Sequence, residues 1–104
     1  MAAPWNPPTK AQDFEFAVCL EDYQNPGQFK ANPTLAAGDV TISKDVAAFA
    51  NLTTLPSVAP ASGRQVACAL SITEMTADKV TVIFHDQTVP PEWADLAITI
   101  LTTA

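Results

Sequence analysis

The strongest constraint on the fold of this chain is a set of short segments in which apolar and polar residues alternate, separated by connections rich in proline. The alternating segments span 14–21, 39–43, 64–72, 79–86 and 93–101, with a shorter one near 48–52. Nine prolines against three glycines favour long, stiff connections over two-residue hairpin turns. No segment keeps a helical period over the ten or more residues that a helix between parallel strands requires. The chain is therefore predicted to be all-β, as a single immunoglobulin-like antiparallel β-sandwich of about 6–7 strands.

The alternation also predicts which side chains enter the core, because successive side chains of a strand point to opposite faces. The inward set consists of Phe14, Phe16, Val18, Leu20, Val40, Ile42, Val66, Cys68, Leu70, Ile72, Val80, Val82, Phe84, Leu96, Ile98 and Ile100. Residues 73–78 fit one helical turn, with Thr73 as its cap and Met75 in the core. Cys19 falls on the face opposite to that of Cys68, which predicts two free thiols and synthesis in a reducing compartment.

The first 13 residues are predicted to form an extended arm that precedes a sandwich domain of residues 14–104. Pro4, Pro7 and Pro8 favour an extended backbone, and Trp5 lies between them. Two interpretations stay open for this segment: a disordered tail, or an arm that lies on a neighbouring subunit and is anchored through Trp5. Trp5 and Pro7 are accordingly candidate interface residues.

The charge balance argues against several classes of partner. Eleven acidic residues against five basic ones give a net charge of −6, and the bases are scattered along the sequence. Nucleic-acid backbones and anionic membrane surfaces attract clustered Lys and Arg, so we expect neither as a partner. The apolar runs are far shorter than the roughly 20 residues of a membrane-spanning helix, and "MAAPWNPPTK" lacks the apolar core of a secretory signal.

The residues that could carry chemistry are few and poorly placed for it. His85 is the one histidine, and no serine lies in a G-x-S-x-G context. Zinc needs three or four convergent nitrogen or sulfur ligands, which this composition does not supply. Asp86, Glu92 and Asp95 flank one turn and could form an acid/base pair or a calcium site, although carboxylates in turns usually cap backbone groups. We therefore expect no enzymatic activity, no metal and no cofactor.

Two adjacent strands are predicted to carry apolar side chains on their outer face. Thr81, Ile83 and His85 point outward, and pairing with the last strand would place Leu101 on the same face. An outward apolar row indicates a surface that a partner covers. Trp93, at the entry to the last strand, is expected to close the core; the alternative is that it binds a ligand together with Tyr23.

Three stretches resemble a small β-sandwich module that is common among structural proteins of tailed bacteriophages. They are "AAGDVTISKDVAAFANLTTLPSV", "VACALSITEMTADKVTVIFHD" and "EWADLAITI", and the likeness spans about residues 34–103. Its members often show D-V-x-(I/L)-S-K-D, then A-F-A-N-(I/L), (T/S)-x-x-E-M-x-A-D-x-V-x-V and E-W-x-D-L. They usually carry Gly-Gly after S-K-D, where this chain has Val46-Ala47. This departure argues against a tight turn there, and suggests that a partner covers the apolar tip.

The resemblance implies a non-enzymatic virion protein made in the cytoplasm of a bacterial host. The leading hypothesis is a capsid decoration (cement) protein that braces major capsid subunits and contacts copies of itself. The alternative is a tail, baseplate or neck component, including a receptor- or carbohydrate-binding module. The candidate interface residues are Trp5, Pro7, Val46, Phe49, Ile83, His85 and Leu101.

Overall fold

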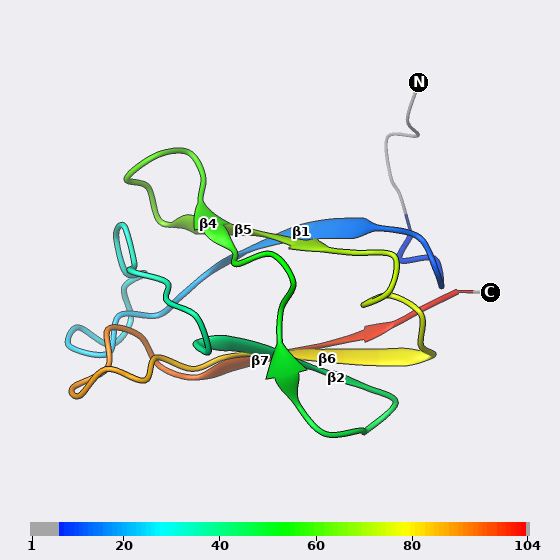
Figure 1. Cartoon of the computed structure of the whole chain (residues 1–104). Helices are drawn as coiled ribbons and strands as arrows, with labels where there is room; N and C mark the ends of the chain where they lie inside the picture. Colours follow the sequence, from blue (N-terminus) through cyan, green and yellow to red (C-terminus); the bar gives the residue numbers. More distant parts are fainter. Residues whose placement is uncertain (1–6, 104) are drawn as a thin grey trace.

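The structure is a computed structural model that describes residues 7–103. This part of the chain forms seven short β-strands. Figure 1 shows them in two layers. They are β1 (Phe14–Cys19), β2 (Val40–Lys44), β3 (Ala50–Asn51), β4 (Ser57–Val58), β5 (Gln65–Leu70), β6 (Lys79–Phe84) and β7 (Leu96–Leu101). The described residues contain no helix, and thus none long and apolar enough to cross a membrane. The all-β prediction is confirmed.

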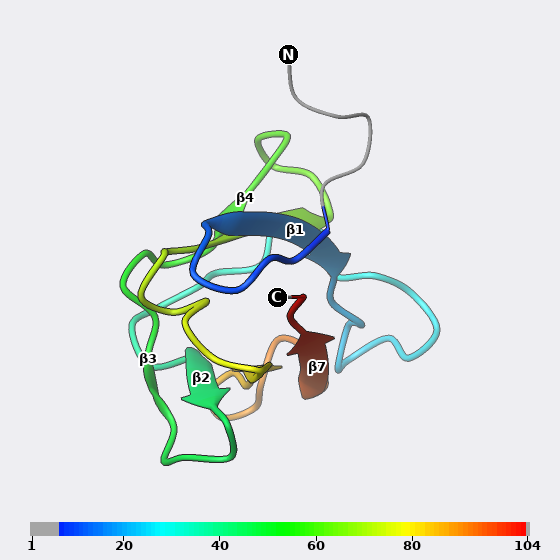
Figure 2. The same ribbon diagram turned by 90° about the vertical axis from the view of Figure 1, so that its right-hand side faces the viewer.

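Both layers are antiparallel sheets. One has the strand order β1-β5-β4 and the other has the order β3-β2-β6-β7. In the first sheet Phe14 lies opposite Leu70, and in the second Phe84 lies opposite both Val40 and Leu96. Figure 2 looks onto the end of the sandwich where the described chain begins and ends, with β1 in the upper layer and β7 in the lower. This arrangement is consistent with a β-sandwich.

The core lies between the sheets and consists almost entirely of the predicted inward residues. Leu20, Val66, Cys68, Val80, Val82, Phe84 and Trp93 are all fully buried. The aromatic ring of Phe16 meets that of Phe84 edge-on across the layers, with 6.5 Å between ring centroids. The prediction for Ile72 is wrong: its side chain is 57% exposed, because β5 ends at Leu70 and the chain turns away from the core.

A buried carboxylate organises the turn after β5. The backbone N–H of Ser71 donates to Oε1 of Glu74 (2.8 Å), and the backbone N–H of Glu74 donates to the Ser71 hydroxyl (3.2 Å). This is the reciprocal pattern of a capping box, so the cap is Ser71 and the prediction of Thr73 is wrong. Oε2 of Glu74 accepts a third bond from the N–H of Thr53, which ties the turn to the segment after β3. Met75 is fully buried, as predicted.

The segment before β1 returns to the end of β7. Thr9 forms a parallel bridge with Thr103, and a turn closed by the bond from Gln12 N to Thr9 O leads into β1. Pro7 is partly buried at the start of the described chain, whereas Trp5 lies outside the described residues. Cys19 is exposed and Cys68 is buried, and both are free thiols as predicted.

Candidate functional site

The connection between β2 and β3, which carries Val46 and Phe49, contains two consecutive non-glycine residues with positive φ. The backbone N–H of Ala47 donates to the carbonyl of Lys44 (3.0 Å), and the two central residues, Asp45 and Val46, have φ values of 50° and 66°. This is the pattern of a type I′ turn, which strongly prefers Asn, Asp and Gly. The expectation of a turn that is not tight is therefore wrong, and a β-branched residue occupies a left-handed position.

Side-chain hydrogen bonds fix the backbone of this turn. One oxygen of Asp45 accepts from the backbone N–H groups of Asp78 and Lys79, both at 3.0 Å, and the Ser43 hydroxyl donates to the Ala47 carbonyl at 2.6 Å. The side chain of Val46 is 82% exposed and that of Phe49 is 48% exposed. The backbone is thus fixed, while the two apolar side chains, which we call the loop tip, face solvent.

The outer row predicted on β6 and β7 is present. Thr81 lies opposite Thr99 and Ile83 opposite Ala97, while Lys79 lies opposite Leu101. Ile83 is partly buried on this face, and Leu101 is 67% exposed. The last strand does pair with β6, the condition on which the outer row depended, so Ala97, Thr99 and Leu101 lie on the same face as Thr81 and Ile83.

The structure gathers some of the candidate interface residues and separates others. The backbone N–H of Asp45 donates to the carbonyl of Lys79 (2.8 Å), so the loop tip begins at the end of β6 that pairs with Leu101. His85 follows the other end of β6, where its Nδ1 lies 2.7 Å from a carboxylate oxygen of Asp95. The tip and the Leu101 end of the row are therefore neighbours along β6, and His85 belongs to a different part of the surface.

The carboxylates after β6 serve as acceptors for backbone groups. Asp86 accepts from the hydroxyl of Thr88 (2.6 Å) and from the N–H of Glu92 (2.6 Å), and Glu92 accepts from the N–H of Thr34 (3.0 Å). Burial of Asp86 opposes its ionisation, but these hydrogen bonds outweigh burial and hold the pKa of its carboxyl below the usual value. Among the described residues, no three His, Cys, Asp or Glu side chains converge as a metal site would require.

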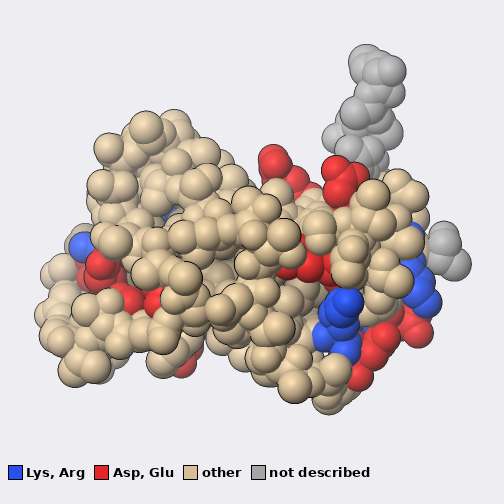
Figure 3. Space-filling model, viewed as in Figure 1, with Lys and Arg blue, Asp and Glu red and all other residues tan. Residues whose placement is uncertain are grey.

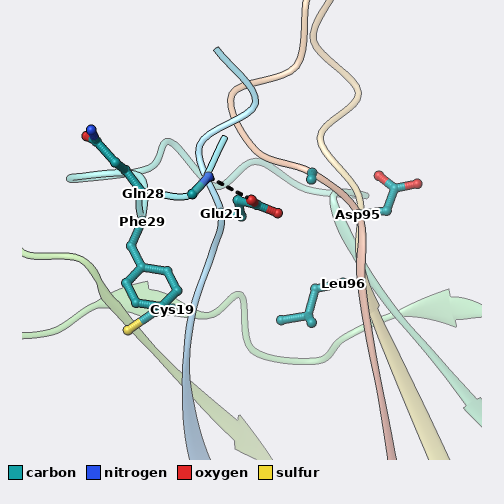
Figure 4. A pocket seen from close by; sticks show the side chains of 8 residues that line it. Cys19, Glu21, Gln28, Phe29, Asp95 and Leu96 are labelled. Atoms are coloured by element: carbon teal, nitrogen blue, oxygen red, sulfur yellow. Dashed lines mark hydrogen bonds between the residues drawn. The ribbon is translucent and has the colours of Figure 1, made fainter. Parts of the chain in front are cut away.

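A pocket of about 380 Å³ opens where β1 ends and β7 begins (Figure 4). Cys19, Phe29 and Leu96 are among its lining residues, and Phe29 is 55% exposed. Of its two carboxylates, Glu21 accepts from the N–H of Gly27 (2.9 Å) and Asp95 contacts His85. Both carboxylates that line the pocket are thus engaged in local hydrogen bonds.

Figure 3 shows how charge is distributed over one face of the molecule. Lys and Arg side chains appear toward its two ends, while carboxylates appear both at the ends and near the middle. One ion pair joins Lys10 and Asp78, with 3.0 Å between nitrogen and oxygen. This hydrogen bond, together with the charge of Asp78, raises the pKa of Lys10.

Trp93 is fully buried, so it closes the core as expected and cannot stack on a ligand. Tyr23, the other aromatic considered for ligand binding, is 52% exposed in the connection after β1. A further aromatic, Phe29, is exposed in the same connection. The alternation pattern does not predict its position, because Phe29 lies outside any alternating segment.

The carboxylates that tie loops together were also missed by sequence reasoning. Asp39 is buried and accepts from the backbone N–H groups of Ala36 and Gln87, and Asp45 and Glu74 act in the same way elsewhere. All three belong to the stretches that resemble the phage module, G-D-V, S-K-D and T-E-M. These stretches could have predicted the role of the three residues, because an Asp or Glu side chain next to a turn commonly accepts hydrogen bonds from backbone N–H groups.

A comparison with known proteins gave no match: no family model, no curated protein and no solved structure is significantly similar to this chain. The resemblance to phage structural modules consequently rests on the quoted stretches alone.

Proposed function

We propose that this chain is a non-enzymatic structural protein of a tailed-bacteriophage particle, in the form of a capsid decoration protein that contacts major capsid subunits and copies of itself. The observation that carries the proposal is the loop tip. Val46 is 82% exposed at a backbone conformation that suits glycine, and the hydrogen bonds of Asp45 fix it there. An apolar side chain held in a strained, exposed position is better suited to contact a partner than to stabilise its own fold.

The strand order supports an immunoglobulin-like assignment. In such sandwiches the second, fifth and fourth strands share one sheet, and the third, sixth and seventh share the other. Here β1, β5 and β4 correspond to the second, fifth and fourth strands of that scheme, and β2, β6 and β7 correspond to the third, sixth and seventh. β3 is then an additional strand beside β2, and no strand occupies the first position beside β1 in the described chain. A rigid sandwich of this kind displays its connecting loops at both ends.

The hydrogen bonds of the acidic side chains support a non-enzymatic role. Asp39, Asp45, Glu74 and Asp86 all accept from backbone N–H groups that close turns. A general acid or base has to be free to reach a substrate proton, and these carboxylates are engaged in holding loops.

The first test is to count copies of this chain relative to the major capsid protein in purified particles, by quantitative mass spectrometry. A ratio near one to one is expected for a decoration protein. A count of only a few to a few tens per particle would refute the decoration role, and would place the chain at a vertex, neck or tail.

The second test concerns the loop tip itself. Val46→Asn removes the apolar contact but suits the left-handed backbone, so the variant should fold at least as well as the natural protein. Added to particles that lack this chain, it should bind more weakly than the natural protein, whereas the matched control Ile72→Asn, at another exposed aliphatic residue, should bind normally. Equal binding of the two variants would show that the loop tip is not the contact.

The alternative is a tail, baseplate or neck component that binds a receptor or carbohydrate. The observation in its favour is the pocket with the exposed ring of Phe29 and the carboxylates of Glu21 and Asp95, since aromatic faces beside carboxylates suit sugar rings. Glycan-array binding that is lost in Phe29→Ala would support this alternative. Binding that is absent, or that survives the substitution, would remove its basis.

A further inference from the structure

The loop tip and the pocket at the end of β1 lie at opposite ends of the sandwich. Asp45, at the base of the tip, bonds to Lys79, the first residue of β6. Leu96, in the pocket lining, pairs with Phe84, the last residue of β6. The six residues of β6 therefore separate the two surfaces, a length of roughly 17 Å. Because the backbone of the tip is fixed, a contact between a tip and a pocket has to join two copies of the chain.

The loop tip is a projecting apolar surface. In Figures 1 and 2 the connection between β2 and β3 extends away from both layers. Val46 is largely exposed on it, and Phe49 is about half-exposed. Two apolar side chains on a fixed, projecting backbone can enter a concave partner without rearrangement, which lowers the entropy cost of binding.

The pocket has the complementary shape. Its volume of about 380 Å³ falls within the roughly 300–1,000 Å³ that is typical of binding pockets. Figure 4 shows Cys19 and Phe29 on one side of it and Leu96 on the other. An apolar occupant would remove the exposed ring of Phe29 from water, and this is the main source of affinity for such a contact.

Positive charge accompanies the loop tip. Lys44 precedes the tip in sequence and donates to the Thr73 carbonyl (3.1 Å), and Lys79 lies at the base of the tip. Neither lysine forms an ion pair within residues 7–103. The neighbouring carboxylates are already engaged, Asp45 by backbone N–H groups and Asp78 by an ion pair.

The pocket carries the opposite charge. Oε2 of Glu21 accepts from the N–H of Gly27, and Oδ1 of Asp95 contacts His85, which leaves the second oxygen of each carboxylate for a partner. The lining residues that the structure describes include no basic side chain. Lysines beside an apolar tip thus match carboxylates beside an apolar pocket, and such complementarity steers association and fixes its orientation.

We propose that the loop tip of one copy docks into this pocket of a second copy, head to tail. The two surfaces differ, so the contact is heterologous and its repetition produces rows or closed rings of copies. It is smaller than the roughly 1,200 Å² of a stable interface, and is therefore weak between free molecules. On a particle the high effective concentration of neighbouring copies compensates for this weakness. The inference rests on the proposed decoration role, for which it names the partner of the loop tip.

Thiol–disulfide exchange tests the contact, because Cys19 lines the pocket and Cys68 is buried. The variant Val46→Cys/Cys19→Ser carries its accessible thiol at the tip, and this thiol is activated as a mixed disulfide with 2-thiopyridine. When the variant is mixed with the natural protein, Cys19 attacks the mixed disulfide, links the two copies and releases coloured pyridine-2-thione. The control is Val89→Cys/Cys19→Ser, activated in the same way. Val89 is 92% exposed, more than Val46, and lies in the connection between β6 and β7, away from the tip.

The tip variant is expected to react with Cys19 about tenfold faster than the control, because docking raises the concentration of its activated thiol at the pocket. Asp95→Lys in the natural protein should lower this ratio of rates roughly threefold at low salt, where charges are least screened. The ratio cancels any change in the intrinsic reactivity of Cys19.

Equal rates for the tip variant and the control would overturn the proposal, and would leave the pocket to a carbohydrate or to another virion protein. A ratio that Asp95→Lys does not change would overturn it as well, because the carboxylates of the pocket would then take no part in docking. The copy count in purified particles decides the decoration role separately, so failure of the contact and failure of the role are distinguishable.

Discussion

Replacing Val46 by glycine should make this protein more stable, although the substitution removes a side chain. Val46 has a φ of 66° in a turn whose hydrogen bond from Ala47 to Lys44 fixes the backbone. A left-handed conformation costs an L-residue about 1–2 kcal/mol, and glycine adopts it freely. Because the Val46 side chain is 82% exposed, its removal takes away little buried apolar surface. Glycine in turn costs ~0.5–1 kcal/mol through the freedom of the unfolded chain.

The difference predicts a net gain of roughly 0.5–1 kcal/mol for Val46→Gly, or a rise of about 2–6 °C in Tm for a domain of this size. Urea and thermal unfolding followed by circular dichroism measure both quantities, and the urea slopes should agree between variants. The matched control is Ala47→Gly in the same turn. Ala47 is exposed and is not among the residues with positive φ, so this variant should lose about 0.4–1 kcal/mol. Equal losses in both variants would refute the argument that Val46 is strained.

Three further outcomes follow from buried polar groups and thiols. A thiol reagent should label only Cys19 in the native protein and both cysteines in denaturant. The reason is that burial, with a smaller contribution from Glu74, raises the pKa of Cys68 to about 12. Rapid labelling of both thiols in the native protein would contradict this. Asp86→Asn should lose about 1–3 kcal/mol at neutral pH, because the lowered pKa of Asp86 means that the ionised carboxyl stabilises the fold. That difference should be present above the usual pKa of 3.8 and vanish as the pH falls below the folded-state value; a difference that persists in acid would contradict it. Glu74→Ala should lose about 1–3 kcal/mol in urea unfolding, because the partly buried N–H of Ser71 loses its acceptor, whereas the exposed Thr53 can bond to water. A loss under about 0.5 kcal/mol would show that water replaces the carboxylate at both groups.

The strands, their inward faces and the free state of the two thiols follow from local patterns along the chain. Alternation is a local property: in a strand the side chain at each second position enters the same layer, so Val80, Val82 and Phe84 are assigned to the core without knowledge of any partner. The same argument failed at Ile72, because alternation does not report where a strand ends. There the capping bonds of Glu74 end the strand early.

The pairing of the strands and the neighbours of each surface residue depend on contacts between distant parts of the chain. The loop tip adjoins the end of β6 because Asp45 accepts from the N–H groups of Asp78 and Lys79, more than thirty residues away in the sequence. An apolar groove of about 440 Å³ likewise lies between β1 and β7, strands far apart in the sequence that are each the end strand of a sheet. The positive φ of Val46 likewise follows from a turn held by these distant contacts, and it overrides the local preference of a β-branched residue. Long-range hydrogen bonds to backbone N–H groups leave no periodic trace in a sequence, since any residue except proline can supply the donor.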